Sequence, residues 1–235
     1  MGYGDTTVVL PTLNEERTVA RLIREIRAGY RGISVIVVDD GSTDGTADAV
    51  RRVSRADGSI AFIERGRAGL RPGLTASVLE GIRRSRTRFV IVMDADMQHP
   101  VATIEKIHAE LLKGSAIAVA VRRNTKDWPV GRKAVSRTLM LFGYIILLLR
   151  RRKRTSDIFS GYFGIAKVKV YRIIRRNRRR FVGEGYKVLF DLLKCIGPDD
   201  GITISEIPYV FGCRRFGTSK ANAAHALALL KSFFS

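Results

Sequence analysis

Short runs of β-branched residues alternate with amphipathic stretches through the first half of the chain, and this alternation restricts its fold more than any other feature. The amphipathic stretches carry apolar residues at helical spacing, as at Val19, Leu22 and Ile26, which indicates helices that bury one face. Strands that alternate with helices require right-handed crossovers, and therefore a mostly parallel sheet that helices cover on both faces. The sequence predicts an α/β fold with strands at residues 7–10, 35–38, 60–64, 89–93 and 117–121 and helices at 19–26, 44–54, 74–84, 139–149 and 168–174.

The basic residues are distributed very unevenly along the chain. Of 235 residues, 46% are hydrophobic, which suits one large folded domain and excludes wholesale disorder. Residues 1–121 hold 17 Lys and Arg against 15 Asp and Glu, whereas residues 122–194 hold 21 against 4. The net charge of +20 therefore comes almost entirely from one segment. Its expected partner is polyanionic, either a nucleic acid or an anionic membrane surface.

Cysteine content and hydropathy restrict the setting in which the chain works. Cys195 and Cys213 form no Cys-x-x-Cys pair, which argues against a disulfide scaffold and a structural zinc site. The first residues lack the charged and apolar regions of a secretory signal. The longest apolar stretch, residues 139–149, is interrupted only by Gly143 and is shorter than the roughly 20 residues of a membrane span. We therefore expect no secretion signal and no bilayer span.

Polar residues follow three of the predicted strands, at residues 11–15, 39–40 and 94–98. In an open parallel sheet, ligands bind outside the carboxyl ends of the strands. In an extended segment Asp94, Asp96 and Gln98 would point the same way, and their oxygens suit Mg²⁺ or Mn²⁺ with positions left for substrate phosphates. A single Asp-x-Asp fits a strand-end turn with helix-capping acids equally well. Three such loops at one sheet edge favour a ligand site.

Five motifs occur in an order typical of one enzyme family, at residues 10–15 (LPTLNE), 37–46 (VVDDGSTDGT), 93–100 (MDADMQHP), 160–162 (SGY) and 214–220 (RRFGTSK). With these motifs the chain resembles glycosyltransferase family 2, which has the nucleotide-sugar-binding GT-A fold. Within that family it is most similar to the dolichyl- and polyprenyl-phosphate mannose synthases. The resemblance spans most of the chain and implies a single GT-A catalytic domain over residues 1–235.

The resemblance implies which residues bind the nucleotide-sugar donor. Those expected to line the nucleotide pocket or to hydrogen-bond the base, the ribose or the metal-bound diphosphate are Pro11, Leu13, Glu15, Asp39, Asp40 and Asp94. A Mg²⁺ or Mn²⁺ ion held by Asp94, Asp96 and Gln98 would bridge the donor diphosphate, which gives Asp96 a catalytic role. The family usually carries an aromatic residue where Leu13 stands, so a stacking surface is missing and the choice between guanine and uracil stays open.

A phosphorylated lipid acceptor accounts for further matched residues. A phosphomonoester has a second pKa of about 6 and is already anionic at neutral pH. It needs positioning and charge neutralisation more than a general base. Arg122, Arg132, Arg214 and Lys220 match the family's basic positions, and we expect each of them to contact phosphate. The competing interpretation of each is a solvated surface cation.

The function that the resemblance implies is an inverting, metal-dependent transfer of mannose from GDP-mannose to dolichyl or polyprenyl phosphate at the cytoplasmic face of a membrane. Residues 122–154 would form an insertion that contacts the membrane interface and the acceptor, and residues 219–235 an amphipathic interface helix. The basic runs 150–154 and 175–180 would face anionic headgroups, at about 1 kcal/mol of attraction per residue. A core or dimer helix is the competing interpretation of residues 139–149.

Three other functions fit parts of the sequence. A transferase that uses UDP-glucose or a UDP-N-acetylhexosamine with the same acceptor shares every motif. A nucleic-acid-binding protein fits the charge, but the arginine runs lack interleaved aromatic residues and the strand-end acids would have no task. A haloacid-dehalogenase-like phosphatase places its Asp-x-Asp after the first strand of its core, which this chain does not do. We expect no nucleic acid partner; a small membrane-anchoring subunit and a membrane segment beyond Ser235 stay open.

Overall fold

The computed structural model describes residues 2–66, 73–123, 130–183, 187–212 and 232–233. At its centre lies a seven-stranded sheet in the order β3-β2-β1-β4-β6-β5-β7. The strands are β1 (Thr6–Thr12), β2 (Ser34–Asp39), β3 (Ile60–Glu64), β4 (Phe89–Val92), β5 (Ile117–Arg122), β6 (Phe163–Ala166) and β7 (Ile204–Tyr209). The helices are α1 (Val19–Gly29), α2 (Thr46–Ala56), α3 (Leu74–Arg84), α4 (Thr103–Leu112), α5 (Val130–Leu149), α6 (Lys167–Arg176) and α7 (Val188–Cys195), with a short 3-10 helix at Arg178–Arg180.

The sheet is parallel except for one strand, which confirms the predicted α/β fold class. β1 pairs in parallel with β2 and β4, β2 with β3, and β5 with β7. β6 runs antiparallel between β4 and β5. Every residue of β1 is buried, as expected for a central strand with helices on both faces. The carboxyl ends of β1, β2 and β4 therefore meet at one edge of the sheet.

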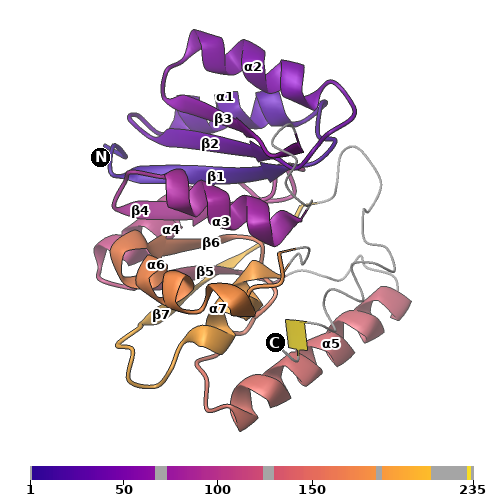
Figure 1. The fold of residues 1–235 in the computed structure, drawn as a ribbon, viewed down its shortest axis with the longest axis vertical. Helices are drawn as coiled ribbons and strands as arrows, with labels where there is room; N and C mark the ends of the chain where they lie inside the picture. The colour runs from indigo at the N-terminus through magenta and orange to yellow at the C-terminus, as the bar shows by residue number, and fades with distance from the viewer. Residues whose placement is uncertain (1, 67–72, 124–129, 184–186, 213–231, 234–235) are drawn as a thin grey trace.

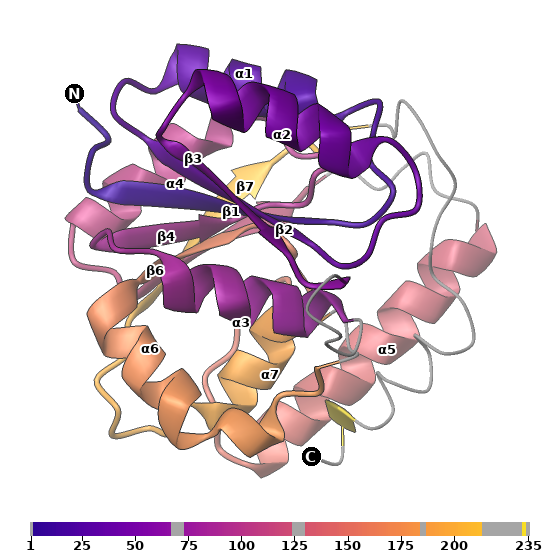
Figure 2. The ribbon, with the colours of Figure 1, turned by 45° about the horizontal axis from the view of Figure 1, so that its top comes forward.

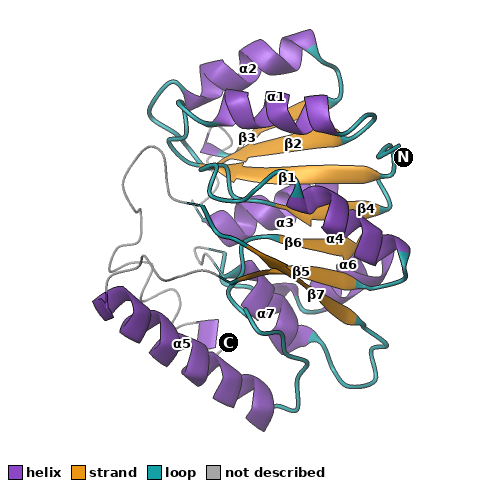
Figure 3. Cartoon of the chain, turned by 180° about the vertical axis from the view of Figure 1, so that it is seen from behind, coloured by secondary structure: helices purple, strands orange, loops and turns teal. Residues whose placement is uncertain are grey.

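Helices cover both faces of the sheet and form two apolar cores. One core joins the sheet to α3, α6 and α7, the face seen in Figure 1. The other core joins it to α1, α2 and α4, and α1 and α4 face the viewer in Figure 3. The acidic strand ends belong to a framework that is packed from both sides, which fixes their positions relative to one another.

The predicted elements of the first half agree closely with the structure. β3 and α3 have the bounds expected from the sequence, residues 60–64 and 74–84. β4 ends one residue before the expected Met93. α4, β6, β7 and α7 were not among the expected elements. β6 has only four residues, and β7 contains Pro208, which is tolerated because β7 lies at the sheet edge.

The helix expected at residues 139–149 is the second half of α5, a longer helix of 20 residues. It runs along the outside of the molecule beside α7 (Figures 1 and 2). One side packs inward: Leu147 is fully buried, and a methyl group placed on Gly143 would lie 2.6 Å from Ile158 Cδ1. The opposite side exposes five apolar residues, Leu141, Phe142, Ile145, Leu148 and Leu149. The helix is thus part of the core on one side and largely exposed on the other.

Two residues near the end of the chain dock between α5 and α7. Phe233 is buried, and its ring centroid lies 4.9 Å from that of Phe142 and 5.4 Å from that of Phe190. Ser232 Oγ donates a hydrogen bond to Asp191, which also forms a buried ion pair with Lys194 at 3.0 Å. Burial raises the pKa of Asp191 and lowers the pKa of Lys194, and their mutual attraction opposes both shifts.

Replacement of Phe233 with Ala is expected to lower the free energy of unfolding by about 3 kcal/mol, because it empties a buried aromatic site. Urea denaturation followed by circular dichroism measures the change. Val210→Ala removes apolar atoms from a side chain that is 64% exposed and serves as the control, with an expected change below about 0.5 kcal/mol. Equal stability of the two variants would show that Phe233 does not stabilise the contact between α5 and α7.

Candidate active site

The loops that follow β1 and β2 are tied together by hydrogen bonds at the carboxyl edge of the sheet. Asn14 Oδ1 accepts from the Thr43 amide at 2.8 Å, and the Asn14 amide donates to Ser42 Oγ at 2.8 Å. The Glu15 amide donates to Thr46 Oγ1 at 2.7 Å. Pro11 is buried within β1, whereas Leu13 is exposed. The structure thus brings the expected nucleotide-binding residues of both loops to one place.

Asp39 and Asp40 are both occupied by contacts within the protein. The Asp39 carboxylate accepts from Thr12 Oγ1 and from the amides of Gly41 and Ser42, so it orders the turn after β2. Gly41 has a φ of 95°, a conformation that glycine adopts readily. Any hydrogen bond from a ligand to Asp39 must therefore replace or share one of these bonds.

Asp40 holds the segment that follows β3. Its carboxylate pairs with the buried Arg65 guanidinium and accepts from the Gly73 amide at 2.5 Å and from Ser77 Oγ at 3.1 Å. Burial raises the pKa of Asp40, although these donors and the Arg65 charge act in the opposite direction. Arg65 was not expected from the sequence, because its partner lies 25 residues away. The glycine loop between Arg65 and Gly73, residues 67–72, lies outside the described residues.

The acidic segment after β4 bends, so the expectation of an extended segment was wrong. Met97 has a φ of 59°, and the Gln98 amide donates to Asp96 Oδ1 at 3.1 Å across the turn. The side-chain amide of Gln98 donates to the Gly212 carbonyl at 3.1 Å. The hydrogen bond within the turn competes with extended geometry, a frequent behaviour of aspartate after a strand. The turn, and not strand alternation, sets the positions of the three expected metal ligands.

A histidine and a tyrosine orient Asp94. His99 Nε2 lies 3.2 Å from Asp94 Oδ2, and Tyr209 Oη lies 2.9 Å from His99 Nδ1. Because an ionised carboxylate only accepts hydrogen bonds, Nε2 donates to Asp94, while Nδ1 is hydrogen-bonded to the Tyr209 hydroxyl. The His99 ring is buried among Tyr162, Tyr209 and Phe211. This packing fixes the direction in which Asp94 points.

The backbone at Gly161 also limits where Asp94 can lie. A methyl group on Gly161 would lie 2.6 Å from Asp94 Oδ2 and 3.1 Å from its Cγ. The motif at residues 160–162 is thus explained by contact, because only a residue without Cβ lets the carboxylate approach the chain so closely. Ser160 Oγ donates to the Ala120 carbonyl at 2.7 Å, which ties this turn to β5.

Positive charge surrounds Asp94. Burial alone would raise the pKa of its carboxyl group, but the hydrogen bond from His99 and the nearby cations Lys187 and Arg122 outweigh burial and lower that pKa. Burial raises the pKa of Tyr209 far above its ordinary range, and the carboxylates of Asp94 and Asp96 both add to that rise. Asp94 and Asp96 therefore act electrostatically on the same small region.

Arg122, an expected phosphate contact, is paired with Asp157. The pair is bidentate, with Nε to Oδ2 at 2.7 Å and Nη2 to Oδ1 at 2.8 Å. The guanidinium also lies 5.6 Å from the centre of the Phe211 ring. Asp157 thus fixes the orientation of the guanidinium at the carboxyl end of β5, close to Asp94. Asp157 and Lys187 were missed from the sequence, because neither belongs to a recognisable motif.

The remaining expected phosphate contacts cannot be placed by their side chains. Arg132 belongs to α5, but its side chain lies outside the described part of the chain, which covers side chains of this helix from Ser136 onward. Arg214 and Lys220 lie in residues 213–231, also outside the described residues. Most of the expected interface helix at residues 219–235 also lies outside the described residues.

The donor atoms at the bend suit a divalent metal ion. Asp94 and Asp96 supply carboxylates. The Gln98 nitrogen Nε2 donates a hydrogen bond to Gly212, so the side-chain oxygen Oε1 is the atom of Gln98 that could bind a metal ion. His99 holds Asp94 as outer hydrogen-bond partners commonly hold metal ligands. Within the described residues, no three His, Cys, Asp or Glu side chains gather as a complete ligand set. Two carboxylates and one amide oxygen suit a Mg²⁺ or Mn²⁺ ion, with the remaining coordination positions filled by the phosphates of a substrate.

Comparisons with known proteins show the family to which the chain belongs. Residues 7–175 match the family model "Glycosyl transferase family 2". The dolichol-phosphate mannosyltransferase of Saccharomyces cerevisiae is 28% identical over 226 residues, which cover 91% of this chain and 80% of that protein. The dolichol-phosphate mannosyltransferase of Pyrococcus furiosus is also 28% identical, over 97% of this chain and 62% of that protein.

The fold recurs among solved structures. Glucosyl-3-phosphoglycerate synthase from Mycobacterium tuberculosis, in complex with Mn²⁺, UDP-glucose and phosphoglyceric acid, superposes with a TM-score of 0.66 at 20% identity. The superposition covers 97% of this chain and 78% of the synthase. At this level of identity the likeness concerns the fold.

Proposed function

Because the chain belongs to glycosyl transferase family 2, we propose that it transfers mannose from GDP-mannose to a polyprenyl or dolichyl phosphate. The observation that carries this proposal is the similarity to dolichol-phosphate mannosyltransferases over 91% and 97% of the chain. The product would be a β-linked lipid-phosphate mannose, since the acceptor would attack the anomeric carbon opposite the departing nucleotide.

On the donor side, the two joined loops would hold the nucleoside. Pro11, Leu13 and Glu15 would line its pocket, and Asp39 would exchange a hydrogen bond from its own turn for one from the base or ribose. The structural contacts of Asp40 favour an indirect role, through the segment that follows β3.

On the metal side, Asp94, Asp96 and Gln98 would hold Mg²⁺ or Mn²⁺. The ion would offset the negative charge that develops on the departing diphosphate. His99 and Tyr209 would keep Asp94 in one orientation through their hydrogen bonds. Such preorganisation matters because no free energy is then spent on reorienting the carboxylate as the transition state forms.

On the acceptor side, cations would bind the lipid phosphate. Arg122 is held by Asp157 near Asp94, so its charge would lie close to the proposed metal ligands and could attract the phosphate nucleophile. Lys187, whose charge lowers the pKa of Asp94, would be a further contact. Arg132, Arg214 and Lys220 would complete the set, as the family resemblance implies. Positioning by these cations would replace a general base, because the phosphate oxygen already carries the negative charge.

The membrane contact would be made by α5 and the basic residues that follow it, with the enzyme at the cytoplasmic face. The exposed apolar side of α5 includes Leu141 at 62% and Leu149 at 78% exposure, which suits a helix that lies in the interface. Arg152 lies against Gly197, and Arg176 lies 3.8 Å from Asp200, so the two basic runs converge on one surface. No helix within the described ranges combines the length and the apolar character that crossing a bilayer requires.

Replacement of the exposed Arg150, Arg151 and Arg154 with Ser is expected to weaken binding to anionic liposomes by up to about 100-fold. At about 1 kcal/mol for each cation near the surface, three contribute about 3 kcal/mol. Liposome co-sedimentation measures the affinity. The control removes three exposed arginines, Arg21, Arg24 and Arg31; they belong to α1 or follow it, on the opposite face of the sheet. Equal losses in both variants, or a parallel loss of donor affinity, would contradict the assignment.

Isothermal titration with GDP-mannose, UDP-glucose, GDP and UDP, each with and without Mn²⁺, tests the donor. The proposal predicts metal-dependent binding of the two guanine compounds only. Binding confined to the uridine compounds would indicate a UDP-sugar donor and would contradict GDP-mannose. This outcome is the main alternative because Leu13 provides no aromatic surface for the base. Absence of binding by all four compounds would contradict a nucleotide-sugar donor altogether.

A further inference from the structure

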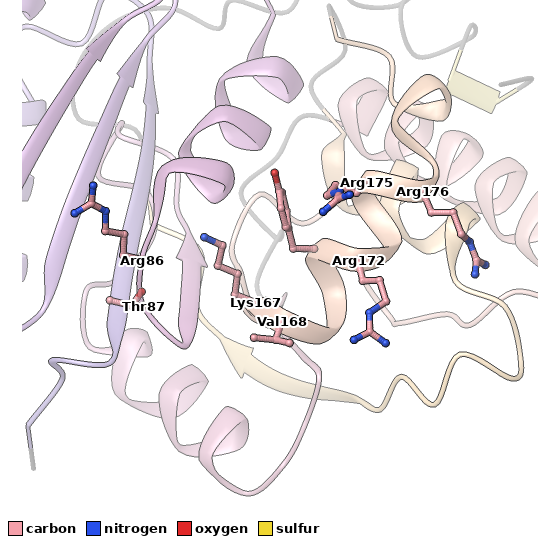
Figure 4. Close-up of a pocket in the computed structure, with 8 residues that line it drawn as sticks. Arg86, Thr87, Lys167, Val168, Arg172, Arg175 and Arg176 are labelled. Carbon is pink, nitrogen blue, oxygen red and sulfur yellow. The ribbon is translucent and has the colours of Figure 1, made fainter.

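A groove of about 680 Å³ lies between α6 and the residues that precede β4 (Figure 4). Its lining residues are Arg86, Thr87, Lys167, Val168, Tyr171, Arg172, Arg175 and Arg176. β4 begins at Phe89, just after this groove, and runs toward Asp94 at the opposite edge of the sheet. The groove is therefore separated from the candidate active site by the length of β4, and the proposed reaction assigns no task to it.

The groove gathers positive charge that its own lining does not balance. Five of its eight lining residues are cationic and none is acidic. Arg172, Arg175 and Arg176 are exposed and lie three and four residues apart on α6, where like charges repel. Arg86 lies on the other wall, across Lys167 from α6, as Figure 4 shows. Folding alone gives no reason to collect these charges, and the proposed membrane contact of the run 175–180 does not account for Arg86, Lys167 or Arg172, whereas a bound anion would.

Neighbouring carboxylates do little to neutralise this charge. Glu80 is bound by Arg83 at 2.6 Å and by Arg84 at 3.0 Å, and neither arginine lines the groove. Asp200 approaches only Arg176, at 3.8 Å. That distance, with the Arg176 side chain 72% exposed, makes a weak surface ion pair.

The floor of the groove is more rigid than its arginines. Lys167 Nζ donates to the backbone carbonyl of Ser85 and lies 5.6 Å from the centre of the Tyr171 ring. Burial lowers the pKa of this ammonium group. Thr87 Oγ1 donates to the Phe89 carbonyl at 2.8 Å. One held ammonium group with guanidinium groups on both walls suits an anion with several oxygens, because guanidinium forks bind phosphate in a bidentate manner.

We infer that this groove is a second anion site, which binds a phosphomonoester or diphosphate group independently of the active site. The chemistry of the ligand is the same whether the phosphate belongs to a lipid headgroup or to a free small molecule. Arg175 and Arg176 also belong to the basic run that is proposed to face the membrane, whereas Arg86, Lys167 and Arg172 do not. The site does not depend on the proposed sugar transfer, so each can fail without the other.

Titration with inorganic pyrophosphate in EDTA tests the site without a divalent metal at the catalytic edge. The variant Arg172→Ser/Arg175→Ser changes two exposed groove residues, and the matched control Arg21→Ser/Arg24→Ser removes the same charge from exposed positions on α1. The site predicts a dissociation constant raised about tenfold or more in the groove variant and by less than about twofold in the control. Thermal unfolding checks that all three proteins are folded. Equal weakening in both variants, or no weakening in either, would overturn the inference.

Vesicles then identify the source of the phosphate. They contain phosphatidylcholine with either phosphatidic acid or phosphatidylserine, matched in surface charge. Loss of a phosphatidic acid preference in the groove variant supports a lipid headgroup ligand. Unchanged vesicle binding together with lost pyrophosphate binding supports a free phosphate compound. Tighter binding of single-stranded RNA than of pyrophosphate, abolished by the same variant, would overturn the inference in favour of a nucleic acid surface.

Discussion

Replacement of Asp96 with Asn is expected to lower kcat about 10²- to 10³-fold while the protein stays folded. Asp96 is buried at the bend after β4, and its charge acts on the same region as that of Asp94. Asparagine keeps the shape but removes one of the proposed anionic metal ligands. A bound metal ion stabilises developing charge by several kcal/mol, and a loss of about 3–4 kcal/mol corresponds to this fall in rate.

Steady-state rates of sugar transfer over a range of Mn²⁺ and Mg²⁺ concentrations measure the effect of Asp96→Asn. The control is Asp199→Asn, which removes the same charge from an exposed loop after α7 and should leave kcat unchanged. A merely structural role for Asp96 would lower thermal stability without changing the metal dependence. Near-normal turnover of Asp96→Asn at saturating Mn²⁺ would contradict its assignment as a metal ligand.

Replacement of Gly161 with Ala is expected to lower kcat about 10²-fold without any change of charge. The new methyl group would lie 2.6 Å from Asp94 Oδ2, too close for both to keep their places. The carboxylate is held by His99 at 3.2 Å, so a shift of about 1 Å would break that bond and move a proposed metal ligand. A misplacement of this size typically costs about 10²-fold in rate.

A glycine elsewhere separates this effect from a general loss of stability. A methyl group on Gly29, the last residue of α1, would contact nothing within 4 Å, so Gly29→Ala should behave as wild type. The Mn²⁺ concentration needed for half-maximal rate should rise for Gly161→Ala only. Retention of wild-type kcat and metal requirement by Gly161→Ala would mean that the position of Asp94 is unimportant for turnover.

The first half of the fold was predictable from the sequence because its signals are local. Buried strands such as β2 are unbroken β-branched runs, and α1 repeats its apolar residues at helical spacing. β6 and β7 lack such signals. β6 is short and contains Gly164, where a side chain would collide with Ile107 of α4, and β7 includes Glu206 and Pro208. Their positions depend on tertiary contacts that no local pattern records.

The candidate site shows the same division between local and distant information. The motifs placed Asp39, Asp40 and Asp94 at the correct edge of the sheet, because each follows a predictable strand. The partners that orient them come from far along the chain: Arg65 reaches Asp40, and Tyr209 reaches Asp94 through His99. The bend at Met97 was also hidden, since an Asp-x-Asp sequence fits extended and turned backbones equally well.

The position of the basic segment has a consequence for the membrane model. The basic runs follow α5 and include the end of α6. Both helices lie on the side of the molecule where α3 and α7 cover the sheet. The near-neutral first half supplies the two joined loops at the carboxyl edge. Arg122 and Lys187 bring part of the charge of the basic segment to Asp94, whereas the basic runs 150–154 and 175–180 lie outside the two joined loops, so a membrane could approach the runs without covering those loops.

Transfer of radiolabelled mannose from GDP-mannose to a polyprenyl phosphate tests the central claim most directly. The purified protein is incubated with donor, lipid acceptor and Mg²⁺ or Mn²⁺, and the lipid phase is extracted and counted, with UDP-glucose as the parallel donor. The proposal predicts labelled lipid from GDP-mannose only, lost in EDTA and in Asp96→Asn. Transfer from UDP-glucose alone, or no labelled lipid from either donor, would contradict it.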